Sequence, residues 1–187
     1  RNWTYTAGTV DAGTSTVVFA IRSLTITGSM TFYNLTFYPT AGYTYTIASG
    51  TTLTVTGTLN LTDGYVNTGD IAAQGNINLA STFDGGTATL NITGTANQTL
   101  TGGGSETAGY CINININKTG GTLTLASTIR TNRNWTYTAG TVDAGTSTVV
   151  FGPYNTITIT GSMSFNNLTF NRAGYTSTIA SGTTLTV

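Results

Sequence analysis

The sequence contains no histidine, one cysteine and two prolines among its 187 residues, and only six basic and six acidic side chains. Without histidine the chain lacks the commonest general base and the commonest metal ligand. Cys111 has no second cysteine for a disulfide and no histidine for a nucleophilic pair. No phosphate-binding loop and no serine-hydrolase motif occurs. We therefore expect a protein that is not an enzyme and that needs no metal and no cofactor.

Charge is equally scarce, because charged residues make up 6% of the chain and the formal net charge is zero. A surface that attracts phosphate needs a strong positive patch, which so few basic residues cannot supply. No apolar run approaches the roughly eighteen residues of a membrane span. We expect neither nucleic acid nor membrane insertion for this segment.

About a quarter of the residues are threonine, and valine, isoleucine, tyrosine and phenylalanine are also frequent. These residue types favour β-strands. Runs such as "TLTV" (52–55), "INININ" (112–117) and "TITIT" (156–160) alternate strictly between aliphatic and polar residues, as strands with one buried side do. Gly-rich and Asp-Gly turn signals separate the runs, and no stretch has helical periodicity. The fold class is therefore all-β.

The chain repeats itself. "RNWTYTAGTVDAGTSTVVF" stands at 1–19 and again, unchanged, at 133–151, and 44 of the first 55 residues recur in 133–187. We interpret 1–132 as one full repeat, with sub-halves of about 1–75 and 76–132, and 133–187 as the start of the next repeat, continuous with the first. A fainter echo relates 9–19 to 82–92.

Two architectures fit short alternating strands in a repeating chain. A parallel β-helix (β-solenoid) stacks coils of about 20 residues, which would give about six coils to each 132-residue repeat. Tandem β-sandwich modules are the alternative. Short monotonous strands, small loops and outward threonine and asparagine favour the β-helix.

The phrases "NWTYTAGTVDAGTSTVVF", "ITGSMTFYNLTF" and "TIASGTTLTVTGTLNL" resemble repeats of large bacterial or archaeal surface proteins of the autotransporter-adhesin and filamentous-haemagglutinin kind. The resemblance covers nearly the whole chain but carries no catalytic signature. It implies an elongated, non-enzymatic β-helical protein that is extracellular or on the cell surface.

The candidate sites are few. Asn-Xaa-Ser/Thr triplets, the acceptors of N-linked glycans, begin at Asn2, Asn34, Asn60, Asn91, Asn97, Asn117, Asn134 and Asn167. Trp3 and Trp135 are equivalent in the repeat and are candidates for stacking on sugars. Asp11, Asp84 and Asp143 occupy equivalent positions, which we interpret as turns. We interpret Asp63 and Asp70 as structural and Cys111 as a free structural thiol.

These observations predict a structural segment of an extracellular filament or surface fibre, whose partners are further repeats of the same chain or neighbouring fibres. A glycan- or surface-binding adhesin stalk is the alternative. An ice-binding β-helix and a polysaccharide lyase are remote alternatives, since the Thr-Xaa-Thr spacing is irregular and the acidic residues are not clustered.

Overall fold

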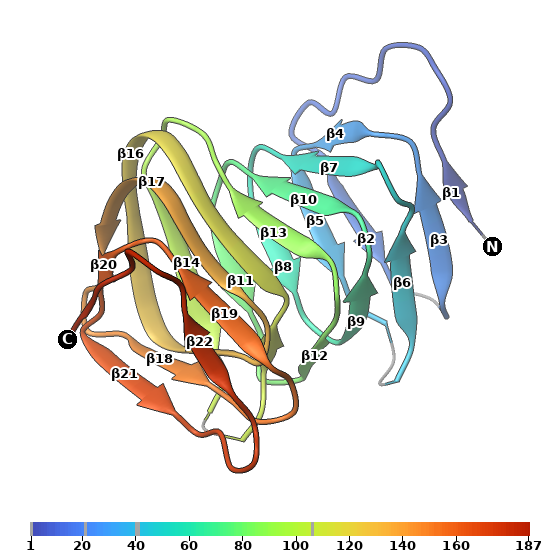
Figure 1. The fold of residues 1–187 in the computed structure, drawn as a ribbon. Coiled ribbons are helices and arrows are strands. Elements are labelled where there is room, and N and C mark those ends of the chain that lie inside the picture. The colour runs from blue at the N-terminus through green and yellow to red at the C-terminus, as the bar shows by residue number, and fades with distance from the viewer. Residues whose placement is uncertain (1, 21, 40–41, 106) are drawn as a thin grey trace.

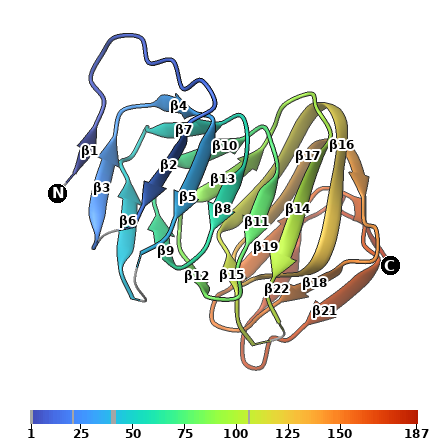
Figure 2. The ribbon, with the colours of Figure 1, turned by 180° about the vertical axis from the view of Figure 1, so that it is seen from behind.

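The computed structural model describes residues 2–20, 22–39, 42–105 and 107–187. Over these ranges the chain forms 23 strands and no helix, and it winds into about nine stacked coils. The β1 and β22–β23 ends of the stack lie at opposite ends of the molecule (Figures 1 and 2). Every strand pairing between described residues is parallel, as in Leu53↔Ile71 and Ile71↔Leu90. The predicted parallel β-helix is confirmed, and the antiparallel β-sandwich is excluded.

Three columns of strands run along the stack, and we call them the first, second and third faces. The first face consists of β1 (Trp3–Thr4), β3 (Leu24–Thr27), β6 (Thr44–Ile47), β9 (Gly64–Asn67), β12 (Phe83–Gly85), β15 (Tyr110–Cys111), the end of β16 (Asn113–Thr131), β18 (Thr148–Phe151) and β21 (Asn167–Phe170).

The second face consists of β4 (Met30–Phe32), β7 (Thr52–Val55), β10 (Asp70–Ala73), β13 (Thr89–Ile92), the start of β16, the start of β17 (Trp135–Asp143), β19 (Ile157–Thr160) and β22 (Ser177–Ile179). The third face consists of β2 (Thr16–Phe19), β5 (Asn34–Phe37), β8 (Leu59–Leu61), β11 (Ile77–Leu79), β14 (Gln98–Gly103), the middle of β16, the end of β17, β20 (Met163–Ser164) and β23 (Leu185–Thr186).

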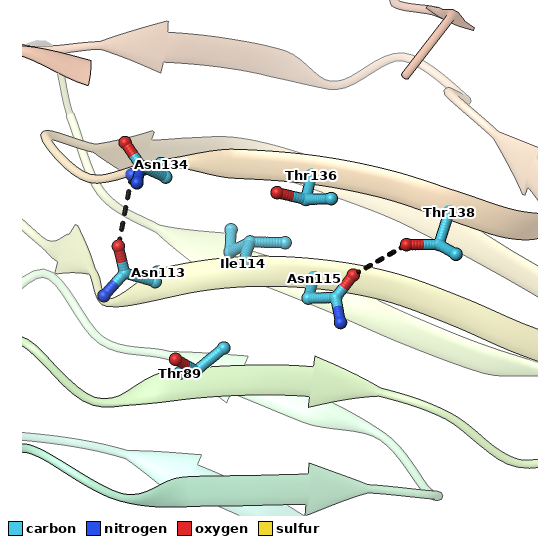
Figure 3. Close-up of a pocket in the computed structure, with 7 residues that line it drawn as sticks. All are labelled: Thr89, Asn113, Ile114, Asn115, Asn134, Thr136 and Thr138. Carbon is cyan, nitrogen blue, oxygen red and sulfur yellow. Dashed lines mark hydrogen bonds between the residues drawn. The ribbon is translucent and has the colours of Figure 1, made fainter. Parts of the chain in front are cut away.

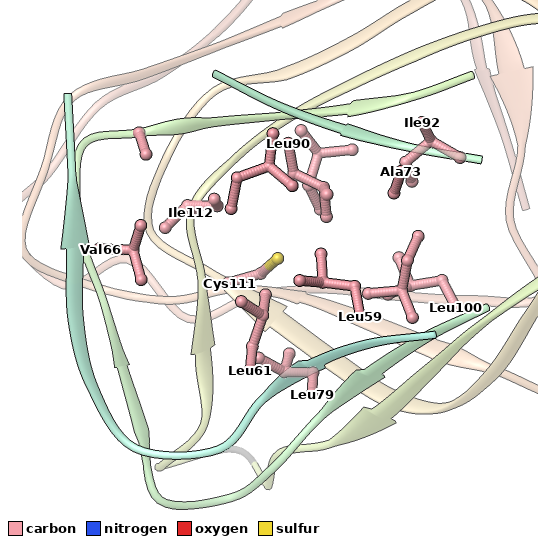
Figure 4. Packing of buried hydrophobic residues seen from close by; sticks show 14 of the residues in the cluster. Leu59, Leu61, Val66, Ala73, Leu79, Leu90, Ile92, Leu100, Cys111 and Ile112 are labelled. Carbon is pink, nitrogen blue, oxygen red and sulfur yellow. The ribbon is translucent and has the colours of Figure 1, made fainter. Parts of the chain in front are cut away.

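The period-two alternation decides which side chains fill the interior. On the second face Leu53, Ile71, Leu90 and Ile114 stack in register and are at most 1% exposed. Aliphatic side chains from the three faces meet inside the prism and form one continuous core (Figure 4). A single coil could not bury this surface, so each coil depends on its neighbours.

Glycines set the corners where coils touch most closely. Gly28 and Gly161 are equivalent in the repeat and have φ of +91° and +86°. A Cβ at either position would lie 1.9 Å from the carbonyl oxygen of Tyr5 or Tyr137. Only glycine combines this left-handed backbone with so close a contact.

The core runs without interruption across residues 132–133, where the sequence repeat begins again. The faint half-repeat echo does not correspond to equivalent places in the prism. Thr16–Phe19 lies on the third face, whereas the matching Thr89–Ile92 lies on the second. The echo therefore preserves a strand pattern and not a position.

Candidate functional site

An asparagine ladder runs up the outside of the second face. The side-chain amide of Asn115 donates to the Oδ1 atom of Asn91 at 2.9 Å, and Asn91 donates to the Oδ1 atom of Asp70 at 3.0 Å. Thr138 adds a hydroxyl donor to Asn115 from the next coil at 3.1 Å (Figure 3). Parallel in-register stacking places like residues about 4.8 Å apart, which allows amides to bond in a row.

A groove of about 500 Å³ lies over this ladder between β13, β16 and β17. It is lined by Thr89, Asn113, Ile114, Asn115, Asn134, Thr136 and Thr138 (Figure 3). Amides and hydroxyls can exchange hydrogen bonds with a polar ligand, but this lining contains no carboxylate, thiol or amine. The groove can bind through hydrogen bonds and has no group for general acid–base catalysis.

In three of the eight glycosylation triplets the side-chain nitrogen of the asparagine already donates a hydrogen bond to a neighbouring coil. Asn34 and Asn60 donate this nitrogen to the hydroxyls of Thr16 and Thr36, both at 3.1 Å, and Asn91 donates it to Asp70. A glycan is attached through this same nitrogen. In the folded chain these three asparagines are poor acceptors.

The other five triplets leave the nitrogen without an acceptor among the described residues. Asn2, Asn97 and Asn134 accept a backbone N–H through Oδ1 and are exposed. Asn117 and Asn167 are exposed and make no side-chain hydrogen bond to any described residue. If the folded chain is glycosylated, Asn117 and Asn167 are the positions where no side-chain hydrogen bond to a described residue has to be broken.

The two tryptophans differ in exposure although their local sequences are identical. Trp135 is fully buried, packed edge-on against Phe151 with ring centroids 6.1 Å apart. Trp3 is 37% exposed and packs in the same way against Phe19 at 5.4 Å. Trp135 presents no ring surface to a sugar, so only Trp3 remains as a candidate for stacking.

The turn interpretation holds for two of the three equivalent aspartates. Asp11 and Asp143 each accept the N–H of the glycine two residues later, at 2.8 and 2.9 Å. Asp84 instead lies within β12, next to a register shift, and its expected turn role is wrong. The sequence echo was misleading because Phe83 and Gly85 pair with β9 and hold Asp84 between them within the strand.

Asp84 is also electrostatically linked to Asp63. Partial burial, and then the charge of Asp63, raise the pKa of Asp84, while a hydrogen bond from the Gly42 backbone opposes the rise. Asp63 accepts the N–H of Gly64 at 2.7 Å, as expected of an Asp-Gly turn. No cluster of three or more metal-ligating side chains occurs among the described residues.

Cys111 and Lys118 are both buried. Burial raises the pKa of the Cys111 thiol to about 12, which keeps it protonated and unreactive. Lys118 is 2% exposed and donates to the carbonyl of Ala96 at 2.9 Å and to the side-chain oxygen of Gln98. Burial lowers its pKa. The lysine thus holds the corner at 94–98 through hydrogen bonds.

A tyrosine column on the outside of the stack was not anticipated from the sequence. Tyr110, Tyr154 and Tyr175 lie along the stack with neighbouring ring centroids 6.4 Å apart, and the coil of Arg130 lies between those of Tyr110 and Tyr154. Tyr154 and Tyr175 are 61% and 44% exposed. The guanidinium of Arg130 lies 4.6 Å from the centre of the Tyr110 ring and is itself buried.

The column was missed because its members are 44 and 21 residues apart and share no motif. Tyr154 belongs to the segment "GPYNTI", where the two copies of the repeat differ. Its backbone has φ of +92°, which is rare for a non-glycine residue and holds the ring across the coils below. Only the stacking of coils brings the three rings together.

The outward threonines do not form an unbroken grid on the second face. The column that begins at Thr31 and Thr54 continues through Ala72, Asn91 and Asn115. A flat ice-binding surface requires the same residue on every coil. This face does not provide it.

Comparison with known proteins found no match: no family model, no curated protein and no solved structure is significantly similar to this chain. Among the described residues there is also no helix that is long and apolar enough to cross a membrane. The fold defines the chain as a parallel β-solenoid, and its function has to be inferred from its own residues.

Proposed function

We propose that this chain is a non-enzymatic structural segment of an extracellular or cell-surface fibre, in which tandem repeats form one stiff β-solenoid rod. The observation that carries the proposal is the continuous core that passes through both copies of the repeat. Leu53, Ile71, Leu90, Ile114 and Trp135 form one in-register row, in which the last residue belongs to the second copy. Such stacking allows the rod to lengthen without a new kind of interface.

The chemistry of the surface supports this proposal. The outward side chains are threonines and asparagines bonded to one another from coil to coil, as in the pair Asn60 and Asn78 at 2.9 Å. Charge contributes little, so the rod depends only weakly on salt. The resemblance of the repeat phrases to adhesin and haemagglutinin-type surface proteins points in the same direction.

The test is the dependence of length and stability on repeat number. Adding whole 132-residue repeats to the chain should lengthen the particle by about 30 Å each, from roughly six coils spaced about 4.8 Å apart. Resistance to proteases should rise with repeat number, because the proportion of end coils falls. Electron microscopy showing particles that grow in width, or beads on flexible linkers, would refute the rod.

A glycan-binding adhesin stalk is the second candidate, and the tyrosine column is the observation that favours it. Exposed aromatic rings bind sugars by stacking on their apolar faces, and the two exposed rings follow one another along the rod. A glycan array should show binding that is lost in the Tyr154→Ala, Tyr175→Ala double variant. Tyr38→Ala is the matched control, because Tyr38 is 54% exposed and lies outside the column. Binding unaffected by the double variant would exclude this site.

A further inference from the structure

The two copies of "RNWTYTAGTVDAGTSTVVF" adopt different structures, and among the described residues a coil lies beneath only the second copy. In the second copy nine residues form the strand β17, Trp135–Asp143, paired with β16. In the first copy only Trp3–Thr4 is a strand at the same place. The two sequences are identical, so their own residues cannot cause this difference. The second copy forms the longer strand because it pairs with β16.

The first copy nevertheless has the same side-chain contacts as the second copy, which β16 covers. The indole N–H of Trp3 lies 3.1 Å from the sulfur of Met30, and Trp135 and Met163 repeat that distance. Both copies have the aspartate turn and the edge-on tryptophan–phenylalanine pair described above. The uncovered edge at β1 and β2 is thus already shaped like a surface that is buried elsewhere in the same chain.

From these observations we infer that the edge formed by β1 and β2 is a docking surface for another copy of the repeat, through the coil equivalent to Tyr110–Thr131. This inference rests on the proposed rod. Within this chain that coil buries Trp135 completely, and Thr128–Thr131 pairs with Thr148–Phe151. The same contacts would cover Trp3, and the same register would pair 128–131 with Thr16–Phe19.

The docking includes a rotation. Trp3 lies on the first face, in the row with Ile26 and Ile47. Trp135 lies on the second face, in the row that leads down to Leu53 and Met30. Between the two tryptophans the first face is visited at β3, β6, β9, β12, β15 and the end of β16, so the chain completes six turns and advances by one further face.

Each repeat therefore turns its successor by one face of a three-sided prism, about a third of a turn. Equivalent residues return to the same face only at every third repeat. The acceptor asparagines and any ligand-binding residues would then be displayed around the whole rod and not along one side. A lateral partner would meet an equivalent surface from three directions.

Docking can be tested on the whole chain with a synthetic peptide of residues 108–132 in which Cys111 is replaced by serine. Hydrogen exchange of backbone amides in residues 3–19 should slow by about tenfold on addition of the peptide, while exchange in 177–187 should not change. A peptide of residues 64–86, another coil of the same solenoid, is the control for non-specific stacking. Equal protection by both peptides, or protection by neither, would overturn the docking.

A backbone variant of the edge sharpens this test. Gly152 donates its N–H to Thr131 at 2.8 Å, and its equivalent in the first copy is Ala20. Ala20→Pro removes this donor at an exposed position and should weaken peptide docking by about tenfold. Ala20→Ser keeps the N–H and should dock normally. Equal docking of both variants would contradict the proposed register.

The rotation is tested by disulfide trapping in a chain that carries Cys111→Ser. Asn115 pairs with Thr136, the equivalent of Thr4. Thr4→Cys in the chain should therefore cross-link to a peptide with Asn115→Cys, since facing residues of adjacent strands lie within disulfide range. Absence of this cross-link, while the peptide still protects residues 3–19 from hydrogen exchange, would overturn the rotation. The rod itself is judged separately, by the dependence of particle length on repeat number.

Discussion

The side-chain amide of Asn115 donates to the side-chain oxygen of Asn91 at 2.9 Å, from one coil to the next. Asn115→Ala removes this bond and the one from Thr138, so we expect it to lower the free energy of unfolding by about 1–2 kcal/mol. Asn117→Ala is the control on the same strand, because Asn117 is exposed, and we expect it to change stability by less than about 0.5 kcal/mol. Urea denaturation measures both, and equal effects would mean that the ladder contributes no stability.

Glycan attachment should follow the availability of the amide nitrogen. In folded chain treated with an N-glycosylating enzyme, we expect glycans at Asn117 and Asn167 and none at Asn34, Asn60 or Asn91. Glycopeptide mass spectrometry measures the occupancy of each position. Efficient modification of Asn91 would show that the ladder opens readily. Unmodified Asn117 and Asn167 would remove the structural basis for expecting glycans on this rod.

Two glycines with left-handed backbones allow the cost of the backbone conformation to be separated from the cost of a steric clash. Gly161→Ala combines a left-handed backbone with a Cβ 1.9 Å from the carbonyl oxygen of Tyr137, and should destabilise the chain by about 2–4 kcal/mol. Gly174→Ala has a similar φ of +79° but open space around its Cβ, so it should cost about 1 kcal/mol. Thermal unfolding followed by circular dichroism compares them. Similar losses would mean that the contact with Tyr137 relaxes freely.

The thiol of Cys111 should be unreactive in the folded chain. It is fully buried and burial raises its pKa to about 12, so at pH 8 it is neither accessible nor ionised. Labelling by a thiol reagent should be more than about a hundredfold slower than in denaturant. Ser164→Cys, at an exposed position in a Cys111→Ser chain, should label at once. Rapid labelling of native Cys111 would indicate that the central coils open locally.

Asp84 makes a pH-dependent contribution to stability. The pKa of Asp84 is raised in the folded chain, so its contribution is present at low pH and is lost as the pH rises through that raised value. Asp63→Asn removes the repulsion but keeps the oxygen that accepts from Gly64. It should lower the pKa of Asp84 and stabilise the chain at neutral pH, with no gain once Asp84 is protonated.

Unfolding measured across the acidic to neutral range tests this expectation, with Asp11→Asn as the control. Asp11 makes the same kind of turn contact, with the N–H of Gly13, and its replacement by asparagine also keeps the acceptor oxygen. A gain that does not depend on pH would show that the charge of Asp63 is not its cause.

Local sequence pattern predicted much of the fold. The alternation in "INININ" placed Ile114 and Ile116 inside and Asn115 outside, as the structure has them. It could not predict that Asp84 lies in a strand, because the deciding factor is the pairing of its neighbours Phe83 and Gly85 with β9. Nor could it predict the tyrosine column, whose members meet only through the stacking of coils.

The sequence alone determined which side chains of each strand point inward and where most corners fall, because these depend on period-two alternation and on glycine and aspartate at the turns. It did not determine where a given strand stands in the prism. Trp3 and Trp135 share their neighbours in sequence, yet one is partly exposed on the first face and the other is buried on the second. Only the tertiary structure decided this, because a residue's face depends on the summed lengths of all preceding coils, and its burial on whether another coil lies against it.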